Sequence, residues 1–327
     1  MQTKKLKIGN LEIDSRVIIA PMAGVSNNAF KKIIRRLGAG LITTEMVSDK
    51  ALLHGNEKTL KMIEIDDEEH PVALQLFGNE IESMVQAAKF LDQHSKCDVI
   101  DINMGCPAPK IVKNDSGSKI LLDPQKVYDI AYNIKQAVTK PVMVKMRLGW
   151  DENHINVLEN VKLLEKAGVD AIAIHGRTTK QMYSGKANWD LIKQAKASVK
   201  IPVIGNGDID SPQKAKEYIE KYGVDAVMIG RAALGNPWII KRTKHYLETG
   251  ELLPEPTVQE RLAVCHEHLL NLVELKGERI AMNEIKGHAS WYLKGIKGAN
   301  KYRRVIQNLS TVEEFDNFLQ EIKTDEA

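Results

Sequence analysis

Cysteine is scarce in this sequence. The 327 residues include three cysteines, Cys97, Cys106 and Cys265, and no two of them are closely spaced. An odd and unpaired set argues against a disulfide framework and against a cysteine-based zinc site. Such usage is typical of a protein from a reducing compartment. We therefore expect a cytoplasmic protein that is held together by its hydrophobic core.

Long apolar runs are also missing. No stretch approaches the roughly 18 residues that a membrane-spanning helix needs. The charged first seven residues are not followed by the apolar core of about 7–15 residues that a secretory signal requires. Hydrophobic residues make up 43% of the chain and charged residues 27%, which is ordinary for a globular protein. We expect no membrane partner, and the net charge of +3 permits a polyanionic partner without demanding one.

The sequence has no G-x-G-x-x-G after its first strand candidate and no His/Asp/Glu cluster with metal-ligand spacing. Instead, short apolar runs alternate with amphipathic segments between residue 17 and about residue 240. This alternation predicts βαβ units and a parallel sheet. Eight repeats fit a (β/α)8 TIM barrel better than a doubly wound sheet. The strand candidates are Val17–Met22, Leu41–Met46, Val72–Phe77, Val99–Met104, Val142–Arg147, Ala171–Gly176, Val203–Asp208 and Ala226–Arg231.

The pattern changes after Trp238. Prolines and a glycine between Thr249 and Pro256 indicate a linker. Thr257 and Glu260 then form a capping box ahead of apolar residues at helical spacing. We predict three parts: a catalytic barrel (1–243), a linker (244–256) and a small all-helical domain (257–327).

The stretch Asp101-Ile-Asn-Met-Gly-Cys-Pro-Ala-Pro-Lys110 ends one predicted strand abruptly. Glycine breaks the strand and the two prolines delay a helix, so we expect a stiff loop that holds Asn103 and Cys106 at the functional end of the barrel. A thiol with an ordinary pKa of about 8.5 is protonated at neutral pH and suits a general acid. A nucleophile would need a neighbouring base, for which His175 is a candidate. The residues alone leave both roles open.

Two further strand ends indicate a phosphate site. The last two strands end in Gly205-Asn-Gly207 and Ile229-Gly-Arg231. Glycines there let backbone N–H groups approach a phosphate, which Arg231 can also contact; alternatively they only turn the chain. Lys145 and Arg147 lie two residues apart and share a strand face. Lys145 could stabilise the negative charge of a reduced flavin ring, or could pair with a barrel carboxylate.

Together, six segments resemble the tRNA-dihydrouridine synthases, and within them the bacterial DusB-like branch. They are Ala20-Pro-Met-Ala-Gly24, Gln75-Leu-Phe-Gly78, Asp101-Ile-Asn-Met-Gly-Cys-Pro107, Val144-Lys-Met-Arg147, Gly205-Asn-Gly-Asp208 and Gly230-Arg-Ala-Ala-Leu-Gly-Asn-Pro-Trp238. The resemblance covers nearly the whole chain. The chain departs from the family pattern at Val25-Ser-Asn-Asn28, where Thr-Asp is common, and at Glu284-Ile-Lys-Gly-His288, where an Arg-Lys-His run is common.

The resemblance implies a flavoenzyme that uses FMN and NADPH to reduce the C5–C6 double bond of uridines in RNA, above all in tRNA. It implies hydride transfer from flavin N5 to C6 and a proton from Cys106 to C5. Asn103, Arg147 and Arg177 are expected to contact the substrate. Residues expected to bind FMN are Pro21, Met22, Ala23, Gln75, Lys145, His175, Asn206, Gly207, Asp208, Gly230 and Arg231. We expect no metal and a monomer.

The helical tail fits an RNA partner. From Lys276 to Arg304 there are eight Lys and Arg residues against two Glu, with Trp291, Tyr292 and Tyr302 interleaved. Such a patch can neutralise phosphates, although a solvated helix face is the alternative. Two other functions stay open: a small-molecule FMN oxidoreductase of the dihydroorotate dehydrogenase-like type, and a non-catalytic RNA-binding barrel. The target uridines, tRNA against ribosomal RNA, and NADPH against NADH also stay open.

Overall fold

A computed structural model describes residues 5–325. Residues 1–4 and 326–327 lie outside the described part. The start of the charged N-terminal segment, which is also the start of the predicted barrel domain, and the last two residues of the predicted helical domain therefore lie outside it. Eight parallel strands form a closed barrel because the last strand pairs with the first. All eight predicted strands are present, and five of them end up to three residues early. The strands are β3 (Val17–Ile19), β4 (Leu41–Thr43), β6 (Val72–Phe77), β7 (Val99–Met104), β8 (Val142–Arg147), β9 (Ala171–His175), β10 (Val203–Asn206) and β11 (Ala226–Ile229), with a short β5 (Val47–Ser48) beside β6.

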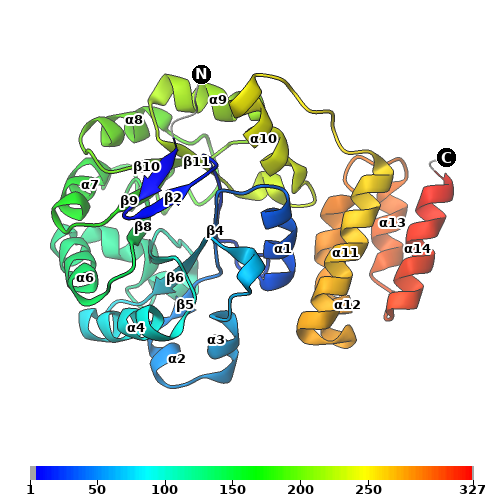
Figure 1. Ribbon diagram of the computed structural model, residues 1–327, viewed down its shortest axis with the longest axis horizontal. Helices are drawn as coiled ribbons and strands as arrows, with labels where there is room; N and C mark the ends of the chain where they lie inside the picture. The colour runs from blue at the N-terminus through cyan, green and yellow to red at the C-terminus, as the bar shows by residue number, and fades with distance from the viewer. Residues whose placement is uncertain (1–4, 326–327) are drawn as a thin grey trace.

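Helices surround the barrel, as Figure 1 shows. Asp123 and Ser211, each followed by a proline at the first helical position, cap two of them with their side chains, and Gly223 ends one in the left-handed conformation. The outer helices are α1 (Asn28–Arg36), α4 (Ile81–His94), α6 (Pro124–Ala137), α7 (Val157–Lys166), α8 (Trp189–Ala197), α9 (Pro212–Tyr222) and α10 (Trp238–Thr249). Shorter elements are α2 (Asp49–Leu53), α3 (Glu57–Met62), α5 (Pro109–Val112) and the 3-10 turns η1 (Asp67–Glu69), η2 (Gly117–Leu122) and η3 (Arg231–Ala233). Among the described residues, no helix is both long and apolar enough to cross a membrane.

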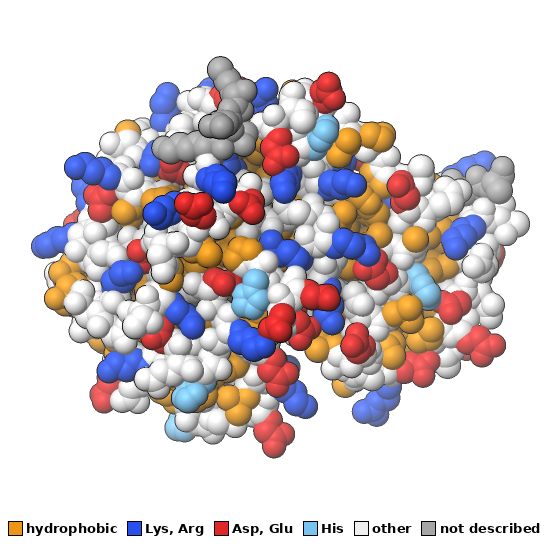
Figure 2. Space-filling model, viewed as in Figure 1, with side chains coloured by type: hydrophobic (Ala, Val, Ile, Leu, Met, Phe, Trp, Pro, Cys, Tyr) orange, Lys and Arg blue, Asp and Glu red, His pale blue; other side chains and the backbone are white. Residues whose placement is uncertain are grey.

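An antiparallel hairpin that the sequence did not predict covers the amino-terminal end of the barrel. It consists of β1 (Leu6–Ile8) and β2 (Leu11–Ile13) and lies in front of the strands in Figure 1. Leu6, Ile8 and Ile13 are buried against residues at the strand starts, among them Ile18 and Val99. Acidic and basic side chains are mixed on this face of the molecule, without a continuous basic patch (Figure 2). The hairpin closes this end of the barrel and leaves the opposite end for a site.

Four helices form a bundle beside the barrel: α11 (Val258–Lys276), α12 (Glu278–Tyr292), α13 (Ala299–Ile306) and α14 (Val312–Asp325). The predicted capping box at Thr257 and Glu260 is present, and α11 ends at Lys276, just before Gly277. Residues 244–249, which we expected in the linker, form the end of α10, and residues 251–256 lie in no helix or strand.

Helix α1 joins the barrel to this bundle. Phe30 and Ile34 pack into the barrel core, whereas Ala29, Ile33 and Leu37 belong to the hydrophobic cluster of α11–α14. The Asn271 amide of α11 donates to the Ala29 carbonyl at 3.3 Å, and Arg36 pairs with Glu267 at 2.6 Å. One helix thus supplies apolar side chains to two cores.

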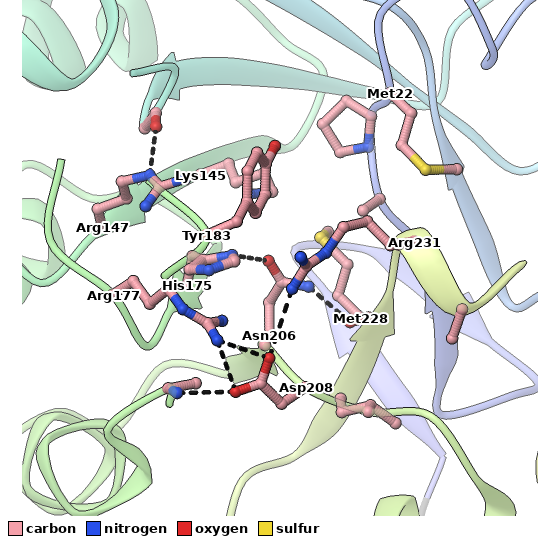
Figure 3. Close-up of a pocket in the computed structure, with 18 of the residues that line it drawn as sticks. Met22, Lys145, Arg147, His175, Arg177, Tyr183, Asn206, Asp208, Met228 and Arg231 are labelled. Atoms are coloured by element: carbon pink, nitrogen blue, oxygen red, sulfur yellow. Dashed lines mark hydrogen bonds and ion pairs between the residues drawn. The ribbon is translucent and has the colours of Figure 1, made fainter. Parts of the chain in front are cut away.

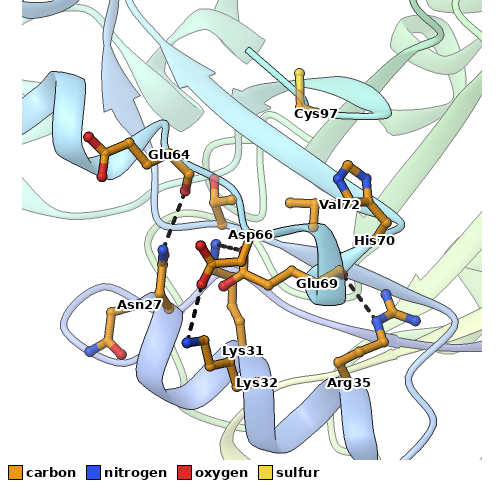
Figure 4. A network of polar contacts seen from close by, with 12 residues as sticks. Asn27, Lys31, Lys32, Arg35, Glu64, Asp66, Glu69, His70, Val72 and Cys97 are labelled. Atoms are coloured by element: carbon orange, nitrogen blue, oxygen red, sulfur yellow. Dashed lines mark hydrogen bonds and ion pairs between the residues drawn. The ribbon is translucent and has the colours of Figure 1, made fainter. Parts of the chain in front are cut away.

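A buried ion pair fixes the inner side of α1, as Figure 4 shows. Lys31 Nζ lies 2.7 Å from Glu69 Oε2 of η1, and both side chains are almost fully buried. Arg35 Nε donates to the Glu69 carbonyl at 3.1 Å, and Lys32 pairs with Asp66 at 3.3 Å. Burial raises the pKa of Glu69 although Lys31 opposes the shift.

Candidate active site

A cavity of about 1180 Å³ opens at the carboxyl ends of the barrel strands. This volume lies slightly above the usual range for small-molecule sites. All fifteen residues that the sequence predicted for the site line the cavity, and Figure 3 shows ten of its lining residues labelled. They are Cys106, Asn103, Arg147, Arg177, Pro21, Met22, Ala23, Gln75, Lys145, His175, Asn206, Gly207, Asp208, Gly230 and Arg231.

The Cys106 loop is held by hydrogen bonds from the strand that precedes it. Asn103 Oδ1 accepts the N–H groups of Gly105 at 3.0 Å and Cys106 at 2.9 Å. The Cys106 carbonyl accepts from the N–H and the hydroxyl of Ser118. Burial raises the pKa of the Cys106 thiol, and this outweighs the Ala108 N–H and the neighbouring cations. No histidine or carboxylate contacts the thiol in the described part of the chain, so the group remains a protonated thiol at neutral pH.

Strand β8 brings two cations to the cavity. Burial, followed by the charge of Arg147, lowers the pKa of Lys145 to about 8. No described carboxylate lies within 4.0 Å of Lys145, although the charge of the buried Asp101 opposes the lowering of its pKa. Arg147 donates from Nε to the Gly105 carbonyl at 2.9 Å and from Nη1 to the carbonyls of Thr178 and Met182. Arg147 therefore ties the Cys106 loop to the loop after β9.

His175 and Asn206 form a buried pair on β9 and β10. Asn206 Nδ2 donates to the Met228 carbonyl at 2.7 Å, so its Oδ1 faces His175 Nδ1 at 2.8 Å. This network assigns the proton to Nδ1 and makes Nε2 an acceptor. Nε2 is buried and has no partner among the described residues. Burial, together with the charges of Lys145 and Arg147, lowers the pKa of His175 to about 2, so the imidazole is neutral.

Asp208 organises the end of the cavity near the glycine loops. Its carboxylate lies 2.8 Å from Arg177 Nη2, accepts the Ala187 N–H at 2.8 Å and lies 3.4 Å from Arg231 (Figure 3). Burial would raise the pKa of Asp208, but these contacts outweigh it and lower the pKa. Arg177 Nη1 is buried without a partner in the described chain. Two arginines against one carboxylate leave a positive charge that suits a phosphate.

Gly207 makes the backbone of this region possible. Its φ is +126°, and a Cβ there would lie 2.7 Å from the Cβ of Ala187. A side chain therefore has neither an allowed conformation nor room at this position. The conformation and the close approach of Ala187 require glycine here, and the phosphate contact at this loop stays a prediction.

Sequence reasoning placed none of the five aromatic residues that line this cavity in the described chain: Tyr183, Trp189, Tyr218, Tyr222 and Trp291. The exposed Tyr183 lies between Arg231, 4.6 Å from its ring centroid, and Arg147, at 5.7 Å. Trp291 of α12 also lines the cavity, so the helical bundle contributes to the site. Neither residue lies near a predicted strand end, and only the path of the chain brings them here.

The basic segment from Lys276 to Arg304 keeps most of its expected positive charge but offers fewer aromatic side chains than expected. Tyr292 and Tyr302 are buried in the bundle core, so of the three interleaved aromatics only Trp291 is available to a partner. Lys276 pairs with Glu284, and Lys301 pairs with Glu321. The other six basic residues of the segment have no ion pair with any described residue: Arg279, Lys286, Lys294, Lys297, Arg303 and Arg304.

The other two cysteines are inert. Cys97 and Cys265 are buried, and burial raises the pKa of Cys97 to about 11 and that of Cys265 further. No group of three or more His, Cys, Asp or Glu residues in the described chain could hold a metal ion.

Comparison with known proteins adds sequence relationships to this geometry. A family model described as "Dihydrouridine synthase (Dus)" matches residues 18–327. A "Probable tRNA-dihydrouridine synthase" of Rickettsia conorii is 41% identical over 302 residues, which cover 92% of this chain and 91% of that protein. A "tRNA-dihydrouridine synthase B" of Pseudomonas aeruginosa is 41% identical over 305 residues, covering 93% and 91%. The protein of the same name from Vibrio vulnificus is 40% identical over 301 residues, covering 92% and 93%.

A solved structure resembles the fold. Histamine dehydrogenase from Rhizobium sp. 4-9 superposes with a TM-score of 0.59 at 14% identity. The superposition covers 82% of this chain and 50% of that one. At this identity the likeness supports the barrel architecture alone.

Proposed function

The chain belongs to the dihydrouridine synthase family, and from this premise we propose that it reduces the C5–C6 double bond of uridines in tRNA, using FMN and NADPH. The observation that carries the proposal is the cavity itself. It brings a protonated thiol on a fixed loop together with an unpaired lysine and a positively charged, glycine-lined end. The thiol can give a proton to a substrate ring, the lysine can face a reduced flavin, and the positively charged end can hold the flavin phosphate.

The residues present fit FMN. His175 Nε2 and Arg177 Nη1 are buried and find no partner among residues 5–325, and such groups are costly unless a ligand satisfies them. Lys145 would neutralise the charge of a reduced isoalloxazine, and Gln75 would contact its edge. Arg231 and the backbone at Gly207 and Gly230 would hold the phosphate, with Asp208 orienting the two arginines. Pro21, Met22, Ala23 and Asn206 would line the remaining flavin surface.

Cys106 would act as the general acid. When bound here and reduced by NADPH, FMN would supply the hydride for C6 of the uracil. The Cys106 thiol gives its proton to C5 and becomes a thiolate, which Lys145 and Arg147 stabilise by charge. No base contacts the thiol in the described chain, which favours the acid over the nucleophile. Asn103, Arg147 and Arg177 would orient the base.

An RNA substrate has to present its uridine at the barrel mouth. A base inside a duplex or a stacked loop must leave its stack to reach such a cavity. Trp291 offers a stacking surface beside the opening, and the unpaired Lys294 and Lys297 follow it closely in the chain. tRNA as the substrate rests on the names of the relatives.

The test is the Cys106→Ala variant. We expect it to bind FMN and to oxidise NADPH with an artificial acceptor at the wild-type rate, but to form little dihydrouridine in tRNA. Removal of a positioned general acid costs about 10²- to 10⁴-fold. Cys97→Ala, at a buried cysteine far from the cavity, serves as the control and keeps its activity. Full dihydrouridine formation by Cys106→Ala would contradict the assignment.

A further inference from the structure

Three buried side chains connect the barrel interior to the Cys106 loop. Gln75 Nε2 donates to Asp101 Oδ2 at 2.6 Å, and Asn103 Nδ2 donates to Gln75 Oε1 at 2.7 Å. Asn103 Oδ1 in turn accepts the N–H groups of Gly105 and Cys106. Each side chain in the series thus orients the next one.

The strand register places these groups together. Gln75 on β6 is paired with Asp101 on β7, and Asn103 follows two residues later on the same face. Asp101 is fully buried and does not line the cavity, whereas Gln75 and Asn103 do. Asp101 therefore lies beneath the cavity floor, where it cannot touch a ligand.

We propose that Asp101 is a positioning residue for Cys106, which acts through Gln75 and Asn103 and fixes the loop that carries the thiol. The expected loss of dihydrouridine formation rests on the function proposed above. The expected change in the Cys106 loop does not depend on that function.

The chemistry of the three groups explains why a carboxylate is needed. A side-chain amide has a donor on one side and an acceptor on the other, and either orientation fits the same space. A carboxylate at position 101 accepts only, so it forces Gln75 to present Nε2 to it and Oε1 to Asn103. If Gln75 turned over, two N–H groups would face each other, and Asn103 would have to turn its own N–H groups toward the loop. The direction of every hydrogen bond up to Cys106 depends on this acceptor.

Asp101 has this role when it is ionised, and keeps it when the proton lies on Oδ1. Burial raises its pKa to about 7, against the opposing effects of the Gln75 hydrogen bond and the Lys145 charge. Oδ1 is buried and has no partner in the described chain, so a proton taken up there leaves Oδ2 as the acceptor. An apolar residue at this position would remove the acceptor altogether.

The experiment compares Asp101→Leu with Asp101→Asn. Leucine removes the acceptor, while asparagine can still offer its Oδ1 to Gln75. Asn160→Leu is the matched control, because Asn160 is also fully buried but hydrogen-bonds to Asn156 outside the cavity. The first measurement is alkylation of Cys106 by iodoacetamide in the flavin-free protein, localised by mass spectrometry. The second is dihydrouridine formation per bound flavin in a single turnover, beside NADPH oxidation with an artificial acceptor.

We expect Asp101→Leu to accelerate Cys106 alkylation by about five- to tenfold, because the population of the loosened loop rises by roughly the strength of one hydrogen bond. Dihydrouridine formation should fall by a similar or larger factor, with NADPH oxidation little changed. Asp101→Asn should lie between Asp101→Leu and the wild type in both measurements. Asn160→Leu should leave both unchanged.

The proposal would be overturned if Cys106 were alkylated in Asp101→Leu at the wild-type rate. It would also be overturned if Asp101→Asn matched Asp101→Leu in its alkylation rate and in its loss of dihydrouridine formation. If Asp101→Leu is too unstable to purify, Asp101→Asn alone decides: its alkylation rate must exceed that of the wild type. A different result would refute the proposed function. If the wild-type protein forms no dihydrouridine but Asp101→Leu still accelerates the alkylation of Cys106, the function is refuted and the positioning role of Asp101 stands.

Discussion

Replacement of Gly235 by alanine should loosen the helical bundle from the barrel. Gly235 lies between η3 and α10, has a φ of +66° and approaches the backbone of α12. A Cβ at this position would lie 2.5 Å from the amide nitrogen of Tyr292, and closer still to the carbonyl carbon of Trp291. Ordinary contact begins at 3.4 Å, so α12 must move by about 1 Å.

The cost has two parts. An alanine in the left-handed region costs about 1–2 kcal/mol. Overpacking against a rigid backbone adds about 1–3 kcal/mol, because a backbone cannot rotate out of the way as a side chain can. We therefore expect a total loss of about 2–5 kcal/mol in the free energy of unfolding, concentrated at the contact between barrel and bundle.

The matched control is Gly250→Ala. Gly250 ends α10 with a φ of +80°, and its Cβ would meet no atom within 4 Å. Gly250→Ala should therefore show the cost of a left-handed alanine without the cost of overpacking. Urea denaturation of both variants, with limited proteolysis of the segment 251–257, separates the two contributions.

Gly235→Ala should also affect the site, because the displaced backbone is that of Trp291, which lines the cavity. Dihydrouridine formation should fall further than flavin binding. Equal stability losses in Gly235→Ala and Gly250→Ala, with equal proteolysis, would refute the close-contact argument.

Further predictions concern the thiol, the buried ion pair and the RNA face. Cys106 must hold its proton to act as an acid, and burial raises its pKa, so single-turnover dihydrouridine formation should fall as pH rises through that pKa. Loss of the Lys145 charge above its pKa of about 8 should add to the fall, and a rate that rises with pH would contradict the acid role. Lys31→Met should cost about 3–5 kcal/mol by urea denaturation, because it leaves Glu69 buried and unpaired, and the double variant with Glu69→Leu should recover much of that loss. Charge reversal at Lys294 and Lys297 should weaken tRNA binding and flatten its dependence on salt, while flavin binding stays unchanged; an unaltered salt slope would exclude this face.

The barrel was predictable because its signals are local. Each strand is a short apolar run, and the helix starts at Asp123 and Ser211 depend on a few adjacent residues. The β1–β2 hairpin was missed because three-residue strands are too short to show a period. Five of the eight strands end earlier than predicted because their apolar and glycine-rich runs continue into the loops that form the site.

The candidate site could be predicted as far as it lies at strand ends. All parallel strands of a barrel end on one side, so polar residues at those ends must converge. Tyr183 and Trp291 depend on the course of a loop and on the docking of a bundle, which no local pattern encodes. The sequence pattern placed Tyr292 and Tyr302 in the basic segment, but both side chains face the bundle core and are buried.

The two-sided packing of α1 has a consequence for synthesis. Ala29 leaves the ribosome early, but Asn271, whose side-chain amide donates to the Ala29 carbonyl, is 242 residues further along the chain. At about 5–20 residues per second, this interval lasts roughly 10–50 seconds. During that time the apolar side formed by Ala29, Ile33 and Leu37 has no permanent cover. The nascent chain therefore exposes an apolar helix face until α11 has been synthesised. Truncation before α11 should produce a barrel that aggregates through this face.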